Sequence, residues 1–254
     1  MPAETRLPDA SIWSHGSMTA ALAGALAGYD TNMEDIAKGA RNTPKSQAYL
    51  AVFTFSPIQE LIKASRKIKD FWAGSWILHY LSAKVCWELA QQYGPDCFLY
   101  PSLYGQPLID HWLLEKYGEQ GFSQWVPQPG DRQLLTAGFP NVIMLVLPKE
   151  KVSAAMQSAK NHLLNAWRNI AHLVFAELQQ RHWQKQLNPT DPTWKHWLDA
   201  QWQTYWSAMA IGAEGKTLKS VGIPKQKHEI KEQRDQRVME QKEEFYDMIY
   251  VKEE

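Results

Sequence analysis

Apolar and polar residues alternate with two different periods in the stretch from Tyr49 to Trp112. Tyr49 to Phe55 is a run of aromatic, β-branched and aliphatic residues, which predicts a buried strand. The segment SPIQ that follows predicts a helix start, with Ser56 as N-cap and Gln59 completing a capping box. The sequence therefore predicts a strand that feeds directly into a helix, followed by a second strand.

The apolar residues of this expected helix recur at steps of three and four, which predicts one buried stripe along a single long helix. The stripe consists of Ile58, Leu61, Ile62, Ser65, Ile68, Phe71, Trp72 and Trp76. The polar residues of the opposite face are Gln59, Lys63, Arg66, Lys67 and Asp70. Unpaired N–H groups at a helix start with basic side chains beyond them can hold a phosphate. Most capped basic helices bind nothing, so a purely solvated face is the competing interpretation.

The remaining elements follow from the same two periods. They are a strand at 97–101, a helix at 108–117, a surface loop at 118–139, a strand at 141–147, a long helix at 149–183 and a final strand at 203–210. The second long helix has its own apolar stripe, formed by Val152, Met156, Leu163, Ala166, Trp167, Ile170, Val174 and Leu178. Trp194, Trp197 and Trp202 suit a helix face, where core packing competes with stacking on RNA or anchoring a partner.

Composition limits the classes of protein to which the chain can belong. With 254 residues, 44% of them hydrophobic and 12% aromatic, the chain can bury the core of one or two domains. Lys plus Arg and Asp plus Glu each number 27, so any RNA contact must be local or shared with another subunit.

The two cysteines and the hydropathy pattern indicate a compartment. Cys86 and Cys97 form no CxxC motif and lie in segments expected to be buried, which predicts a reducing, cytoplasmic environment and no structural zinc. No signal-peptide pattern opens the chain, and no apolar run approaches the roughly 20 residues that span a bilayer. We expect a soluble protein with no membrane contact.

Two segments resemble a known family over much of their length. SPIQELIKASRKIKDFWAGSWILHYLSAK and GPDCFLYPSLYGQPLIDHWL closely resemble the first palm domain of the large subunit of type III-B (Cmr-type) CRISPR-Cas effector complexes. The resemblance implies a part in RNA-guided antiviral defence. In that family two palms together bind ATP and make cyclic oligoadenylate signals when target RNA is captured. The family's catalytic acids form a Gly-Gly-Asp-Asp turn on the second palm, and this sequence lacks that turn.

The order strand, long helix, strand, then strand, long helix, strand is the ferredoxin-like βαββαβ plan. We therefore expect an α+β palm with an antiparallel sheet and both long helices on one face. The other face would be left for a partner, a nucleotide or a second palm.

The resemblance also implies how the chain divides. Residues 1–30 would be the terminal helix of a permuted HD-type nuclease domain, 31–48 a linker, 49–213 the first palm and 214–254 a charged tail, helical or partly disordered. A lone histidine such as His15 is more often structural than a ligand, because a catalytic metal takes about three protein ligands. The resemblance makes His15 a metal ligand only if the rest of the HD site is supplied elsewhere, since no His-Asp doublet occurs here.

For function, the resemblance implies a non-catalytic palm half that contributes to ATP binding and subunit assembly and is inactive alone. The candidate nucleotide contacts are Phe55, Ser56, Ile58, Gln59, Lys63, Arg66 and Lys67. ATP with Mg²⁺ is expected only when a second palm is paired, and no cofactor is expected for folding. Expected partners are other Cmr-type subunits and a second palm in the same or a separate chain, with CRISPR RNA and target RNA reached through the complex. The alternatives are an interaction scaffold or inactive remnant without a nucleotide site, or a local RNA-binding module.

Overall fold

The computed structural model describes residues 11–28, 34, 46–181, 188 and 190–212. All of these belong to one compact unit, Met1–Thr217, while a second unit, Leu218–Glu254, lies outside the described residues. The predicted charged tail at 214–254, most of the predicted linker at 31–48 and the last residues of the helix predicted at 149–183 also lie outside them.

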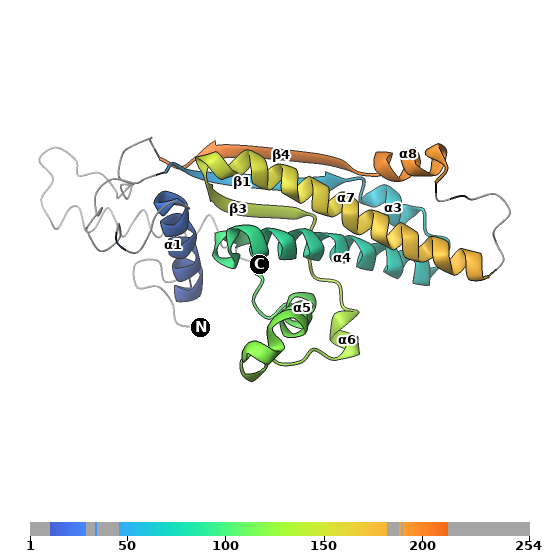
Figure 1. Cartoon of the computed structure of the whole chain (residues 1–254), viewed down its shortest axis with the longest axis horizontal. Helices are drawn as coiled ribbons and strands as arrows, with labels where there is room; N and C mark the ends of the chain where they lie inside the picture. Colours follow the sequence, from blue (N-terminus) through green and yellow to red (C-terminus); the bar gives the residue numbers. More distant parts are fainter. Residues whose placement is uncertain (1–10, 29–33, 35–45, 182–187, 189, 213–254) are drawn as a thin grey trace, which may run out of the picture. The chain divides into compact units, whose positions relative to one another are not determined.

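Four strands form one antiparallel sheet in the order β2-β3-β1-β4 (Figure 1). The strands are β1 (Ala48–Ser56), β2 (Phe98–Tyr100), β3 (Val142–Pro148) and β4 (Gln203–Ala210). β1 is central: it pairs with β3 from Ala48↔Pro148 to Thr54↔Val142, and with β4 from Tyr49↔Ala210 to Ser56↔Gln203. The predictions of an α+β fold and an antiparallel sheet are confirmed.

The helices in the described part of the chain lie before β1 and in the connections between the strands. They are α1 (Ile12–Ala27), α3 (Gln59–Lys63), α4 (Ile68–Tyr93), α5 (Pro107–Tyr117), α6 (Asp131–Leu134), α7 (Lys149–Gln180) and α8 (Pro192–Ala200). Single 3-10 turns occupy Pro95–Cys97 (η1), Gly118–Gln120 (η2) and Phe122–Gln124 (η3). The segment predicted as a loop at 118–139 therefore contains two of these turns and α6.

The main core lies between the sheet and the two long helices. Side chains alternate between the faces of a strand, and Ala51, Phe53 and Phe55 of β1 face the helices together with Ile143 and Leu145 of β3. Buried residues of α4 and α7 complete the same cluster, among them Leu81, Val85, Leu89, Met156 and Leu163. Both long helices therefore cover one face of the sheet, as predicted (Figure 1).

α1 packs on the opposite face of the sheet, at one end of it. Ala21 and Ala25 form a second buried cluster with Ala48 of β1 and Val146 of β3. Small side chains let the helix come close: a methyl group at Gly24 would lie 3.3 Å from Oδ2 of Asp96. The face predicted to be left for a partner is thus covered by α1 near the start of β1.

The predicted helix start at Ser56 is wrong. β1 continues through Ser56, which pairs with Gln203, so its backbone is extended and part of the sheet. The N-cap of the short helix α3 is Ile58, which makes no side-chain capping bond. Helix α4 starts separately at Ile68, so the single long helix predicted from the sequence is two helices.

This break moves part of the predicted apolar stripe into solvent. Ile58, Leu61 and Ile62 pack against the core as predicted. Ile68, however, is 85% exposed, and about half of Phe71 and Trp72 is exposed. The four residues between α3 and α4 do not continue the helical turn, so the two stripes are out of phase. In the second long helix, Val174 is also exposed, and Phe175 is buried instead.

The tryptophans around α8 divide between core and surface. Trp202 follows α8 and precedes β4 in the sequence, and its side chain is buried. Its ring centroid lies 5.4 Å from that of Phe55 and 5.5 Å from that of Trp167. The prediction of core packing is thus confirmed for Trp202, although this residue lies outside α8. Trp197 on α8 and Trp206 on β4 are exposed.

His79 fixes α4 to the segment that precedes β3. Its side chain is buried, with 3% of its surface exposed. Its Nδ1 accepts hydrogen bonds from the backbone N–H groups of Gly138, 3.0 Å away, and Phe139, 2.8 Å away. An atom that accepts two such bonds carries no proton, so the ring is neutral, and burial lowers the pKa of His79.

We predict that His79 makes the fold sensitive to acid. The unfolded side chain takes up a proton near pH 6.5, before the folded one does, so its contribution to stability is full above this pH and is lost as the pH falls below it. His79→Asn, whose amide oxygen can replace Nδ1 without titrating, should reduce the loss of unfolding free energy between pH 7.5 and pH 5.5. The loss assigned to one histidine is at most about 1.4 kcal/mol per pH unit.

Urea denaturation of the native chain and the variant at both pH values checks this prediction. His172→Asn is the matched control, since His172 is exposed and should leave the pH dependence unchanged. An identical pH dependence in the native chain and in His79→Asn would contradict it.

Candidate functional site

The residues predicted to contact a nucleotide lie between the end of β1 and the start of α4, and they fall into a buried and an exposed group. Phe55 is 1% exposed and belongs to the core. Ser56 and Ile58 are half-buried, Ser56 at the end of β1 and Ile58 against the core. These three residues therefore form the base of the turn.

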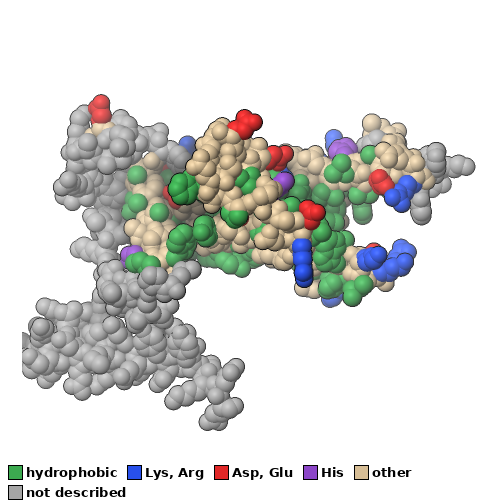
Figure 2. Space-filling view, turned by 90° about the horizontal axis from the view of Figure 1, so that it is seen from below, with side chains coloured by type: hydrophobic (Ala, Val, Ile, Leu, Met, Phe, Trp, Pro, Cys, Tyr) green, Lys and Arg blue, Asp and Glu red, His purple; other side chains and the backbone are tan. Residues whose placement is uncertain are grey.

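The other predicted residues are exposed. Gln59 and Lys63 lie on α3, and Arg66 and Lys67 lie between α3 and α4. Lys63, Arg66 and Lys67, together with the exposed Lys69, are called the basic segment below. In Figure 2, blue Lys and Arg side chains lie beside green hydrophobic ones at the right-hand end, where Figure 1 places the start of α4.

Asp70 organises the backbone of the basic segment. Its Oδ2 accepts hydrogen bonds from the backbone N–H groups of Arg66, 3.3 Å away, and Lys67, 3.2 Å away. A carboxylate in the first turn of a helix also interacts favourably with the helix dipole. Because Asp70 already occupies these backbone donors, an anion bound here would be held chiefly by the Lys and Arg side chains.

Exposed apolar residues adjoin the basic segment. Ile68, Phe71 and Trp72, called the apolar group below, lie within one turn at the start of α4. Cationic side chains hold phosphates, and aromatic rings offer faces for stacking bases. The arrangement can therefore bind an anion that carries a flat or apolar part.

His15 lies on α1, apart from these residues in the sequence and exposed to solvent. Ser11 caps its helix by accepting a hydrogen bond from the Ser14 N–H at 3.0 Å. Within the described residues, no group of three or more His, Cys, Asp and Glu side chains could hold a metal ion. A metal at His15 remains a prediction that depends on ligands from elsewhere.

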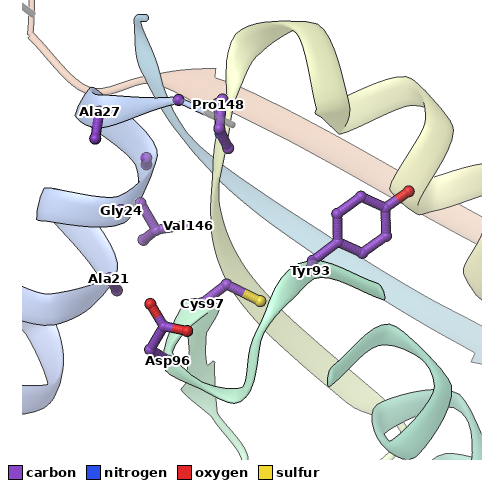
Figure 3. A pocket seen from close by; sticks show the side chains of 10 residues that line it. Ala21, Gly24, Ala27, Tyr93, Asp96, Cys97, Val146 and Pro148 are labelled. Carbon is purple, nitrogen blue, oxygen red and sulfur yellow. The ribbon is translucent and has the colours of Figure 1, made fainter. Parts of the chain in front are cut away.

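A cavity of about 260 Å³ lies between α1, η1 and the end of β3 (Figure 3). Small residues of α1, including Ala21 and Gly24, line one side, and Tyr93, Asp96 and Cys97 line the other. Burial raises the pKa of the Cys97 thiol to about 12, so at neutral pH this sulfur is protonated and is a poor nucleophile. This cavity was not predicted from the sequence, where its signal is the run of small residues in α1.

Residues 50–172, from β1 into α7, match the family described as CRISPR-associated protein Cmr2, N-terminal. This segment is similar to the N-terminal part of Cmr2 proteins. The resemblance drawn from the sequence, to the N-terminal region of the large subunit of type III-B CRISPR complexes, is confirmed. The matched segment includes every predicted nucleotide contact but not His15 or β4.

Two curated relatives carry the same family name. The chain is 26% identical over 164 residues to the CRISPR system Cmr subunit Cmr2 of Pyrococcus furiosus, an alignment that covers 64% of this chain and 15% of that protein. It is 30% identical over 123 residues to the CRISPR system CMR subunit Cmr2 of Saccharolobus solfataricus, covering 48% of this chain and 10% of that protein. The chain thus spans only a small part of the length of these Cmr2 proteins.

No helix in the described ranges is both long enough and apolar enough to cross a membrane. The expected location in the cytoplasm goes beyond this finding and stays a prediction.

We predict that Asp70→Ala lowers the free energy of unfolding by about 1 kcal/mol, because the two backbone donors at the start of α4 lose their carboxylate partner. Urea denaturation monitored by circular dichroism measures the change. Lys69→Ala is the matched control: Lys69 is the exposed neighbour, and its loss should change stability by no more than about 0.5 kcal/mol. Equal effects of the two substitutions would show that Asp70 does not cap the helix.

Proposed function

We propose that this chain supplies the first palm domain of a Cmr2 large subunit in a type III-B CRISPR-Cas effector complex. The observation that carries the proposal is the sheet order β2-β3-β1-β4, all antiparallel, with α4 and α7 on one face. α3 and α4 connect β1 to β2, and α7 and α8 connect β3 to β4, which is the connectivity of a ferredoxin-like βαββαβ palm. The Cmr2 match over residues 50–172 supports the same assignment.

In this proposal the domain is the non-catalytic half of a nucleotide site. Nucleotidyl transfer on two metal ions needs acidic side chains that bind the ions. The four described strands, AYLAVFTFS, FLY, VIMLVLP and QTYWSAMA, contain no Asp or Glu. The acids, and with them the Mg²⁺ ions, would come with a second palm, so the chain alone is expected to make no cyclic oligoadenylate.

The contribution of this chain would be to hold the triphosphate. Lys63, Arg66 and Lys67 are exposed and close together in sequence, and their charges suit phosphate oxygens. Ser56 and Gln59 can donate hydrogen bonds from the turn, while Phe55 and Ile58 hold the turn against the core. ATP would bind as a ligand, and we expect the chain to fold without it.

We predict that ATP binds the isolated chain weakly and that Arg66→Glu with Lys67→Glu weakens this binding about ten-fold or more, because charge-assisted contacts to phosphate are lost. Isothermal titration calorimetry measures the dissociation constants. Lys160→Glu with Lys195→Glu is the matched control, since both lysines are exposed and the change in net charge is the same. No heat and no saturation with the native chain at millimolar ATP would contradict the nucleotide site.

A second candidate function, assembly without a nucleotide, is favoured by the apolar group. Exposed Ile68, Phe71 and Trp72 resemble the apolar centre of a protein interface, with the basic segment as its polar rim. The partners would be other Cmr-type subunits, and CRISPR RNA and target RNA would be reached through them. Direct RNA binding at the basic segment would instead show an affinity that falls steeply with salt.

We predict that Ile68→Ser with Trp72→Ser reduces co-purification with Cmr-type subunits, because the apolar centre of the interface is lost. Co-expression and pull-down with the native chain as reference measure the effect. Leu173→Ser is the control, because Leu173 is an exposed apolar residue on α7. Full retention of the subunits by the double variant would rule out this surface as the assembly site.

A further inference from the structure

The outer edge of β4 is unpaired in the described part of the chain. The sheet order ends with β4, and Figure 1 shows this strand lying beyond β1. The Ile211 N–H donates to the Ala48 carbonyl at 2.8 Å, so the odd-numbered residues of this strand bond to β1. Bonding directions alternate along an antiparallel strand. The N–H and C=O groups of Thr204, Trp206, Ala208 and Ala210 therefore point outward.

This edge lacks the features that normally prevent pairing with another chain. Edge strands are usually short, bulged, or marked by a charged residue or a proline. β4 has eight residues, QTYWSAMA, with no charge and no proline, and its register with β1 is unbroken from Tyr49↔Ala210 to Ser56↔Gln203. The opposite edge of the sheet, β2, has only three residues. β4 is therefore the edge that can add a strand.

We infer that β4 pairs antiparallel with β4 of a second copy of this chain, on a two-fold axis at Ser207. Outward-facing residues must meet outward-facing residues in such a ladder. With the axis at Ser207, Trp206 pairs with Ala208 of the partner subunit, and Thr204 pairs with Ala210 of the partner subunit. All outward donors and acceptors of both strands are then used, and the two four-stranded sheets become continuous.

The side chains fit this register. On the face that bears α7, the large Trp206 lies beside the small Ala208 of the partner subunit. On the other face, Tyr205 lies beside Met209 of the partner subunit, a favourable contact between a ring and a thioether. Met209 is 66% exposed, and Tyr205 and Trp206 are also exposed, so pairing would remove apolar surface from water.

The charge distribution also permits a second copy as the occupant. Every residue near a two-fold axis meets its own equivalent or a close neighbour, so a charged strand would repel itself. Nothing between Gln203 and Ala210 is charged. The nearest acid in the described chain before β4, Asp199, is held by Arg168 at 2.7 Å on α7.

The register can be tested by charge at the axis. Analytical ultracentrifugation over a concentration series should show a monomer–dimer equilibrium for the full chain. Ser207→Lys should raise the dimer dissociation constant about five-fold or more, because two lysines would face each other. Ser207→Glu should do the same, and mixing the two variants should restore the dimer. Ser153→Lys, at an exposed serine of α7, should leave the equilibrium unchanged.

Hydrogen exchange gives an independent readout that does not depend on any variant. The amides of Thr204, Trp206, Ala208 and Ala210 should become protected as the concentration rises, while those of β4 that bond to β1 are protected throughout. Thermal denaturation confirms that each variant is folded. The inference would be overturned if the native chain stayed monomeric at 100 times the concentration needed for detection. It would also be overturned if the protection of the outward amides did not depend on concentration. Dimers that Ser207→Lys leaves intact would overturn it as well.

Discussion

The fold depends on the position of β1 between two antiparallel neighbours. Each residue from Tyr49 to Thr54 has a partner on both sides, so its backbone groups are satisfied without water. The helix-facing side chains Phe53 and Phe55 are almost fully buried, and burying one such ring is worth about 1.5–3 kcal/mol. This strand also positions the candidate site: its end leads into the turn before the basic segment, and its start contacts α1.

The elements that could be predicted are those whose signal lies in their own residues. β1, β3 and β4 are short β-branched and aromatic runs, and the stripe of α7 from Val152 to Ile170 repeats over many turns. The break before α4 could not be predicted in this way, because residues 64–67 contain no glycine or proline. At the start of α4, the Asp70 carboxylate accepts hydrogen bonds from the backbone N–H groups of Arg66 and Lys67, contacts that periodicity does not report.

The candidate site could also be predicted only in part. The exposure of Lys63, Arg66 and Lys67 was predicted correctly from their charge, because a charged side chain rarely lies in a core. The predicted burial of Ile68, Phe71 and Trp72 was wrong, because an apolar residue is buried only if another element covers it. His79 gave no signal at all: one histidine in an apolar stripe looks like any other polar interruption, and its role depends on backbone N–H groups about 60 residues away along the chain.

The position of α1 limits access to one face of the sheet. Because Ala21 and Ala25 lie on Ala48 and Val146, the helix covers the part of the face at the start of β1, and the part around Val52, Thr54 and Met144 stays only half-buried. A nucleotide or protein bound on that remaining area would share a boundary with α1. Helix α1 thus determines how much of this face of the sheet is available, and a shift of this helix by one turn would change the size of the surface offered to a partner without altering the sheet itself.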